Sequence, residues 1–212
     1  MRRIFVFAAA IAVTTSAFAQ LDVVDAQGKK VGTATHTLST AGGKITNKLT
    51  MKMSQQGASI NMTMIFIHTA VGDPVTYTLN MGMTGQGSTM KADGKATFNG
   101  KKATIVMDAM GQKQNKTATA PGTVRDPSAV WVTGKVPAVG TKATYYQLDP
   151  MAGTFSKTTT TYHGLRDLKV GGKAVKAHCV ATVEGTTTSK FYFTSKGELL
   201  KLESPQFNIV KR

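Results

Sequence analysis

Apolar and polar residues alternate with a period of two through most of this chain, in runs that end at glycine or Asx-Gly dipeptides. Successive side chains of a strand point to opposite faces, so this alternation is typical of half-buried antiparallel strands. The three clearest strands are predicted over 44–54, 58–69 and 75–84, with turns at Gln56-Gly57 and Gly72-Asp73-Pro74. They predict a meander with one apolar face and one face rich in Thr, Lys and Asn.

Shorter strands are predicted on both sides of this meander. A hairpin is predicted at Asp93-Gly94, because both positions tolerate positive φ. Asp126-Pro127 resembles an N-cap followed by proline, which predicts a short helix over 127–133 within a crossover over 121–140. In the strand over 174–184, the odd-numbered apolar residues, Cys179 among them, are predicted to face inward. The remaining predicted strands cover 31–39, 88–92, 95–99, 102–108, 112–118, 141–148, 154–162, 168–170, 189–195 and 198–203.

The number of strands determines the expected fold class. A sheet of about a dozen short strands must curve strongly or close in order to hide its apolar face. We therefore predict an all-β fold: a strongly curved antiparallel sheet, half-barrel or barrel-like, with one short helix.

The N-terminus has the layout of a secretory signal peptide. Two arginines precede a short apolar run, and Ala17-Phe18-Ala19 supplies the small-x-small cleavage pattern. We expect a signal peptide over 1–19, cleavage after Ala19, and a periplasmic or secreted mature chain with a single antiparallel β domain over 20–212. The apolar run is shorter than the ~20 residues that span a bilayer, and no later segment predicts a transmembrane helix in the mature form.

The net charge of +15 comes almost entirely from lysine. Arginine is the residue favoured for phosphate and base recognition, and a nucleic-acid surface also interleaves aromatic residues with its basic ones. Neither feature is present, so we expect no nucleic-acid partner. Two interpretations remain open: a solvated surface that protects sheet edges, or attraction to an anionic envelope surface.

No catalytic or metal motif is recognisable. Acid–base catalysis needs carboxylates or histidines gathered in one pocket, yet several of the eleven acidic residues precede Gly or Pro in turns. The four histidines are scattered, although His36 and His68 could meet if their strands are neighbours. We expect no enzyme activity, no catalytic residue, no metal ligand and no cofactor.

Cys179 is the only cysteine, which excludes an intramolecular disulfide. A reactive thiol needs a helix N-terminus or a nearby base to lower its pKa. The adjacent His178 points to the opposite face of the strand. We therefore expect Cys179 to be a buried, small hydrophobic residue.

Methionines occur as i, i+2 pairs on the three strands of the meander. Three interpretations remain open: an ordinary core, an adaptable apolar pocket, or thioether ligands for Cu(I). The lack of an accompanying His or Cys favours the pocket over copper. The predicted pocket residues are Met51, Met53, Met62, Met64, Phe66, Tyr77, Met81 and Met83.

Three segments carry a family resemblance: Gly28–Gly32, Val170–Ala174 and Phe191–Leu199, the last a strand of aromatic residues followed by Lys-Gly and Leu. With the leader and the long strands, the chain resembles bacterial envelope proteins of the LolA-like and DUF3108-like half-barrel type. The resemblance implies a curved sheet around a short helix with an apolar cavity. The chain lacks the several helices of a lipoprotein carrier.

These observations give one hypothesis and two alternatives. The hypothesis is an exported, non-enzymatic binding protein that holds a lipid or other apolar ligand in a β-half-barrel cavity. The first alternative is a structural or interaction protein of the cell envelope that contacts anionic surfaces. The lesser alternative is copper binding by methionine.

Overall fold

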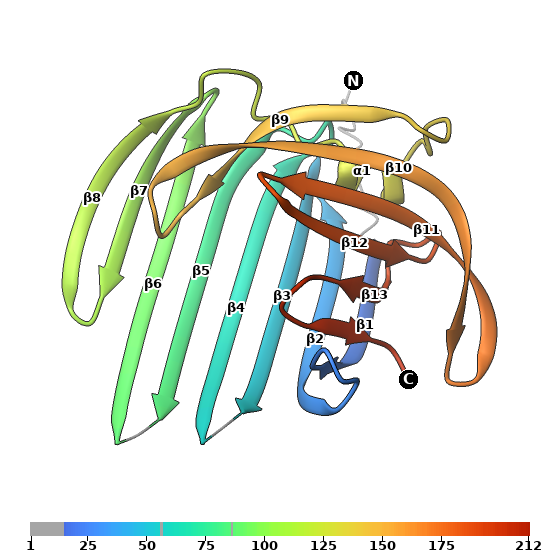
Figure 1. Ribbon diagram of the computed structural model, residues 1–212. Coiled ribbons are helices and arrows are strands. Elements are labelled where there is room, and N and C mark those ends of the chain that lie inside the picture. The colour runs from blue at the N-terminus through green and yellow to red at the C-terminus, as the bar shows by residue number, and fades with distance from the viewer. Residues whose placement is uncertain (1–14, 56, 86) are drawn as a thin grey trace, which may run out of the picture.

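The computed structural model describes residues 15–55, 57–85 and 87–212 (Figure 1). Their strands form one 14-stranded sheet in the order β8-β7-β6-β5-β4-β3-β2-β1-β14-β13-β12-β11-β10-β9. Every neighbouring pair in this order is antiparallel. The predicted fold class, a curved all-β sheet with one short helix, is confirmed.

The N-terminal half of the sheet is an up-and-down succession in which each strand pairs with the next along the chain. Its long strands alternate between an apolar inner face and a polar outer face, as the sequence pattern predicts. The strands are β1 (Thr15–Val24), β2 (Lys30–Ala41), β3 (Lys44–Gln55), β4 (Ala58–Thr69), β5 (Pro74–Gly85), β6 (Ser88–Asn99), β7 (Lys102–Ala109) and β8 (Gln112–Thr119).

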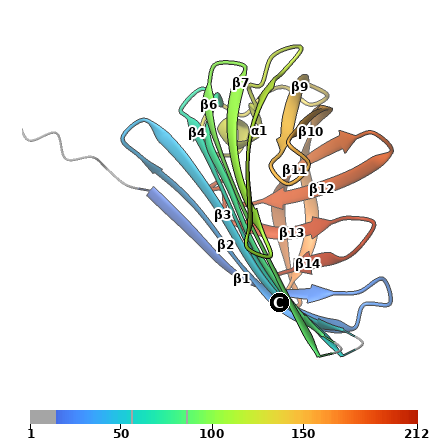
Figure 2. The same cartoon turned by 90° about the vertical axis from the view of Figure 1, so that its left-hand side faces the viewer.

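The C-terminal half folds back over the first, and Figure 2 shows the two halves converging towards the C-terminus. They join where β14 pairs with β1, with Val23 opposite Ile209. Both residues are buried in a core cluster with Leu21, Met51 and Leu199. The strands of this half are β9 (Lys142–Asp149), β10 (Thr154–Val170), β11 (Lys173–Glu184), β12 (Thr187–Phe193), β13 (Leu199–Glu203) and β14 (Asn208–Val210).

The segment between β8 and β9 connects the two edges of the sheet and carries the helix α1 (Ser128–Thr133). The predicted short helix is therefore confirmed. The N-cap is Pro127, which makes no side-chain capping bond, so the predicted N-cap role of Asp126 is wrong; an Asp126 carboxylate oxygen instead accepts a hydrogen bond from the Ser128 N–H at 2.8 Å in the turn that precedes the helix. Trp131 and Val132 pack into a cluster with residues from both halves, and α1 lies between the halves at their wider end (Figure 2).

Two further local predictions are wrong, and two strands were missed. The hairpin predicted at Asp93-Gly94 does not form, because β6 runs through both residues and pairs with β5 and β7. Gly94 lies beneath the β9–β10 turn, where a Cβ would make an ordinary contact of 3.4 Å with the sulfur of Met151. The strands predicted over 154–162 and 168–170 are one strand, β10, with a register shift between Tyr162 and Gly164. Finally, β1 and β14 were not predicted as strands.

Most of the predicted signal peptide, residues 1–14, lies outside the described residues. Residues 15–19 pair with β2, with Ala19 opposite His36. The part of β1 beyond the predicted cleavage point keeps the pairing of Asp22, Val23 and Val24 with β14. Cleavage after Ala19 would therefore keep the β1–β14 pairing but would remove Ala19, which is 1% exposed, from the core cluster at the junction.

None of the helices among the described residues has the length and apolar character needed to cross a membrane.

Candidate functional site

A cavity of ≈ 330 Å³ lies between the two halves of the sheet. Small-molecule sites occupy about 300–1,000 Å³, so this volume suits a small ligand. One wall comes from β2–β5, the opposite wall from β9 and β11–β13, and one end from the start of α1. The lining residues are His36, Leu38, Asn47, Leu49, Met64, Phe66, His68, Tyr77, Asp126, Ser128, Val132, Tyr145, Gln147, Val180, Thr182, Glu184, Thr187, Ser189, Phe191, Phe193, Leu199 and Leu202.

Aromatic and aliphatic side chains form the apolar part of this cavity. On one wall, Phe66 packs edge-on against Tyr77, with ring centroids 4.9 Å apart. On the other, Phe191 and Phe193 alternate along β12 and stack with centroids 6.2 Å apart. An apolar ligand in this space would exchange water contacts for dispersion contacts with both walls.

Polar groups gather at the end of the cavity near α1. The Nε2 atom of His68 lies 3.1 Å from the Tyr77 hydroxyl, and both side chains are buried. The Tyr145 hydroxyl lies 3.4 Å from the hydroxyl of Thr160. Burial, and after it the nearby Asp126 carboxylate, raises the pKa of Tyr77 and of Tyr145. Both phenols therefore stay protonated at neutral pH and can donate hydrogen bonds.

His36 and His68 are only 3% and 4% exposed, and both line the cavity. Desolvation by burial lowers the pKa of His36 to about 4 and also lowers the pKa of His68. The His36 Nε2 atom lies 3.1 Å from the Asn47 Oδ1 atom. Neither histidine's Nδ1 atom has a hydrogen-bond partner among the residues the structure describes. Each ring is therefore an uncharged polar group with one unused nitrogen.

The two histidines do not meet, because β3 separates their strands and His36 is level with Leu49 whereas His68 is level with Ile45. Within residues 15–55, 57–85 and 87–212, no group of three or more His, Cys, Asp or Glu side chains is arranged to hold a metal ion.

The cavity opens at the hairpin between β11 and β12. Glu184 and Thr187 line it and are exposed, whereas Ser189, two residue pairs further from the turn, is half-buried. No lysine or arginine of the described chain lines the cavity, although the sequence contains 26 of them. The basic charge therefore lies on the outside of the protein.

Three of the eight residues predicted to form a pocket line this cavity: Met64, Phe66 and Tyr77. Met51 is 1% exposed and belongs to the core cluster at the junction of the two halves. The cavity covers only the end of β3–β5 nearest the β4–β5 turn, so the alternation identified the correct face but not the position along it. The other four lie outside the cavity: Met53 and Met62 pack against that core cluster, and Met81 and Met83 are half-buried further along the face.

The inward face predicted for the strand over 174–184 is also wrong. The cavity is lined by Val180, Thr182 and Glu184, and Cys179 packs with Tyr192 and other residues in a separate cluster. Residues 177–181 are all buried, so both faces of β11 are covered there and apolar alternation does not identify the inner one.

The buried cysteine leads to a first prediction. Cys179 is 4% exposed, and burial raises the pKa of its thiol. We expect Ellman's reagent to react with the native protein about a hundredfold more slowly than with the protein unfolded in guanidinium. Equal rates in the two conditions would contradict the described packing.

A larger, open depression of ≈ 590 Å³ crosses the outer face of β3–β6. Lys52, Asn61 and Lys91 border it, and Gly82 leaves open space in the same row, with no atom within 4 Å of a Cβ built there. Its lining also includes three of the predicted pocket residues, Met51, Met62 and Met81. It contains no buried polar group. The cavity between the halves is therefore the stronger candidate for a ligand site.

No family model and no curated protein matches the chain. Among solved structures, the crystal structure of a beta-barrel-like protein of domain of unknown function DUF1849 from Brucella abortus is similar, with a TM-score of 0.62 and 11% sequence identity. The match covers 94% of this chain and 95% of that one. At this identity the likeness shows the fold alone: a β-barrel-like architecture.

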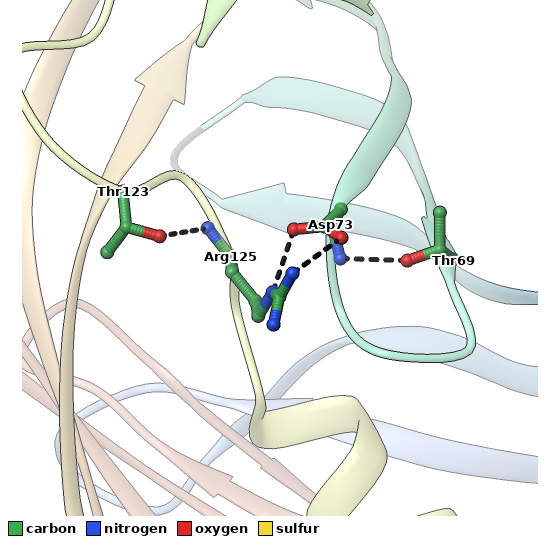
Figure 3. Close-up of polar contacts among 4 residues, drawn as sticks. All are labelled: Thr69, Asp73, Thr123 and Arg125. Carbon is green, nitrogen blue, oxygen red and sulfur yellow. Dashed lines mark hydrogen bonds and ion pairs between the residues drawn. The ribbon is translucent and has the colours of Figure 1, made fainter. Parts of the chain in front are cut away.

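The arrangement at the entrance to α1 holds the polar end of the cavity in place. The Arg125 guanidinium donates to both oxygens of Asp73, with Nε–Oδ1 and Nη2–Oδ2 distances of 2.8 and 3.1 Å (Figure 3). The Asp73 N–H in turn donates to the Thr69 hydroxyl at 3.1 Å. These contacts fix the crossover segment to the β4–β5 turn, directly before Asp126. In the sequence, only an acidic residue in a turn, Asp73, and an isolated arginine, Arg125, mark this contact.

Proposed function

We propose that this protein is a non-enzymatic binding protein that holds a lipid or other apolar small molecule in the cavity between the two halves of its sheet. The observation that carries the proposal is the cavity of ≈ 330 Å³ lined on both walls by aromatic and aliphatic side chains. It agrees with the cavity implied by the resemblance to LolA-like and DUF3108-like proteins. Ligand sites are typically concave, mostly apolar and equipped with a few convergent polar groups.

The proposal includes export. Residues 1–19 have the pattern of a signal peptide, and the pairing of β1 with β14 begins only at Asp22, beyond the predicted cleavage point. We propose a periplasmic or secreted protein, in which an apolar molecule would need shelter from water.

A second candidate function uses the outer face instead. Lysines project from two rows of that face, Lys52 and Lys91 in one and Lys48 and Lys95 in the other, with a row that ends at Asp93 between them. Such a surface attracts anionic lipid or polymer and responds to salt. Copper binding remains the lesser alternative, supported by Met51, Met62 and Met81 in one cross-strand row.

A matched pair of variants on β12 tests the proposal. Ser189 lines the cavity, whereas the adjacent Thr188 is exposed and lies outside the lining. In Ser189→Trp the indole should fill the opening and weaken binding of the apolar fluorophore N-phenyl-1-naphthylamine at least about tenfold, which is about 1.4 kcal/mol. Thr188→Trp should bind as the unchanged protein does, and both variants should keep its far-UV circular dichroism.

Three outcomes would count against the cavity as the binding site: the fluorophore does not bind the unchanged protein, the two variants weaken its binding equally, or neither variant weakens it. Binding to anionic vesicles through the outer face should be the same for the two variants, so this pair also separates the first proposal from the second.

A further inference from the structure

The composition of the cavity wall limits which class of ligand can bind, an inference that rests on the proposed function. We propose that the cavity selects uncharged amphiphiles, with an apolar chain and a hydroxyl or carbonyl headgroup, over anionic ones such as fatty acids and phospholipids. Three features of the wall support this choice: carboxylates without basic side chains, buried imidazoles that stay neutral, and ring nitrogens with unused hydrogen-bonding capacity.

The first feature is the placement of charge. No lysine or arginine of the described chain lines the cavity, whereas Asp126 and Glu184 do. A carboxylate or phosphate that enters must give up its hydration, and a buried anion without a cationic partner is strongly disfavoured. The two acidic side chains would repel it further. A protein of net charge +15 thus has an interior that disfavours anions.

The second feature is the neutral state of the imidazoles. Burial lowers the pKa of His36 to about 4 and lowers the pKa of His68, so neither ring supplies a positive charge at neutral pH. The charged groups near His36 and His68 are Glu198 for the former and Asp126 and Asp73 for the latter. All three are acidic, and their effect on the pKa is smaller than that of burial.

The third feature is unused hydrogen-bonding capacity. The Nδ1 atoms of His36 and His68 have no partner among the described residues, and both side chains are more than nine-tenths buried. With Asn47 Oδ1 accepting from Nε2–H, the Nδ1 atom of His36 is left as an acceptor. Each Nδ1 atom has less than 1 Å² of accessible surface, so a ligand hydroxyl would reach it only when the ring turns; an ionised carboxylate has no proton to donate to it. Buried polar groups gain most when a ligand supplies the missing partner.

Three ligands with the same chain test the selectivity: dodecanol, laurate and dodecane, each displacing N-phenyl-1-naphthylamine at pH 7.5. Sodium chloride at 150 mM screens attraction to the basic exterior, since the Debye length is then about 8 Å. We expect dodecanol to bind at least about tenfold more tightly than laurate, and more tightly than dodecane. Laurate binding as tightly as dodecanol would overturn the inference while leaving the proposed function intact; so would dodecane, because the headgroup would then contribute nothing. If none of the three displaces the fluorophore, the proposed function itself fails.

A charge-introducing pair provides the control. Gln147 lines the cavity, whereas Thr144 on the same strand is exposed and lies outside the lining. Gln147→Lys should supply the missing cation and narrow the preference for dodecanol over laurate at least about tenfold. Thr144→Lys adds the same charge outside and should leave the preference unchanged. An unchanged preference in Gln147→Lys, or equal changes in the two variants, would contradict the inference.

Discussion

Replacing Gly72 by alanine is expected to destabilise the protein by at least about 3 kcal/mol. Gly72 has a φ of +90° on the β4–β5 turn, and a Cβ there would lie 2.2 Å from the Asp126 carbonyl oxygen. Its own carbonyl accepts a hydrogen bond from the Asp126 N–H at 2.9 Å. Alanine would therefore strain the turn and also push the crossover segment away, together with the polar end of the cavity. Guanidinium unfolding followed by circular dichroism measures the loss.

Gly28 is the matched control for this prediction. It has a similar φ of +79°, but no atom lies within 4 Å of a Cβ built on it. Gly28→Ala should therefore show only the backbone strain, about 1–2 kcal/mol. If both variants lose the same free energy, the close packing of the β4–β5 turn on the crossover segment is not a source of stability.

Acid is expected to destabilise the protein through His36. The pKa of His36 is about 4 in the folded protein, against 6.5 as the ordinary value expected in the unfolded chain. Between these two values only the unfolded chain binds the proton. The stability contributed by the uncharged His36 is therefore fully present above pH 6.5 and is lost as the pH falls towards 4. The full difference corresponds to about 3 kcal/mol, of which about 2 kcal/mol should be lost between pH 7 and pH 5. Burial of His68 acts in the same direction, because its pKa is also lowered.

The variant His36→Gln isolates this contribution, because glutamine does not titrate and can still reach Asn47. Free energies of unfolding measured at pH 7 and pH 5 should differ by about 2 kcal/mol less in His36→Gln than in the unchanged protein. An unaltered pH dependence would mean that His36 is accessible to protons in the folded state.

The long strands of the meander were predictable because each has one face against the interior and one against solvent. The strand over 58–69 was predicted with the bounds of β4, and the others of the meander within a residue or two. The hairpin predicted at Asp93-Gly94 failed because both residues lie inside β6, which pairs with β5 on one side and with β7 on the other. Pairing of the whole strand on both sides overrode the local turn preference of the dipeptide.

The candidate site was predictable only in part. Alternation placed the methionines on the inner face, yet it carries no information on how far the second half of the sheet reaches along that face. The cavity therefore includes Met64 but leaves Met51 in the core at the junction of the two halves. Phe191 and Phe193 form the opposite wall because the sheet folds back on itself, which depends on the pairing of β1 with β14. No local pattern reveals a pairing between the two ends of a chain.

Native mass spectrometry of the protein purified without detergent from its own host, after incubation with a lipid extract of that host, tests the central claim most directly. We predict a mature chain that begins at Gln20 and carries one uncharged amphiphile, lost on collisional activation. A bare protein mass under these conditions, or a protein that carries only copper, would contradict the claim that the space between the two halves of the sheet shelters an apolar ligand.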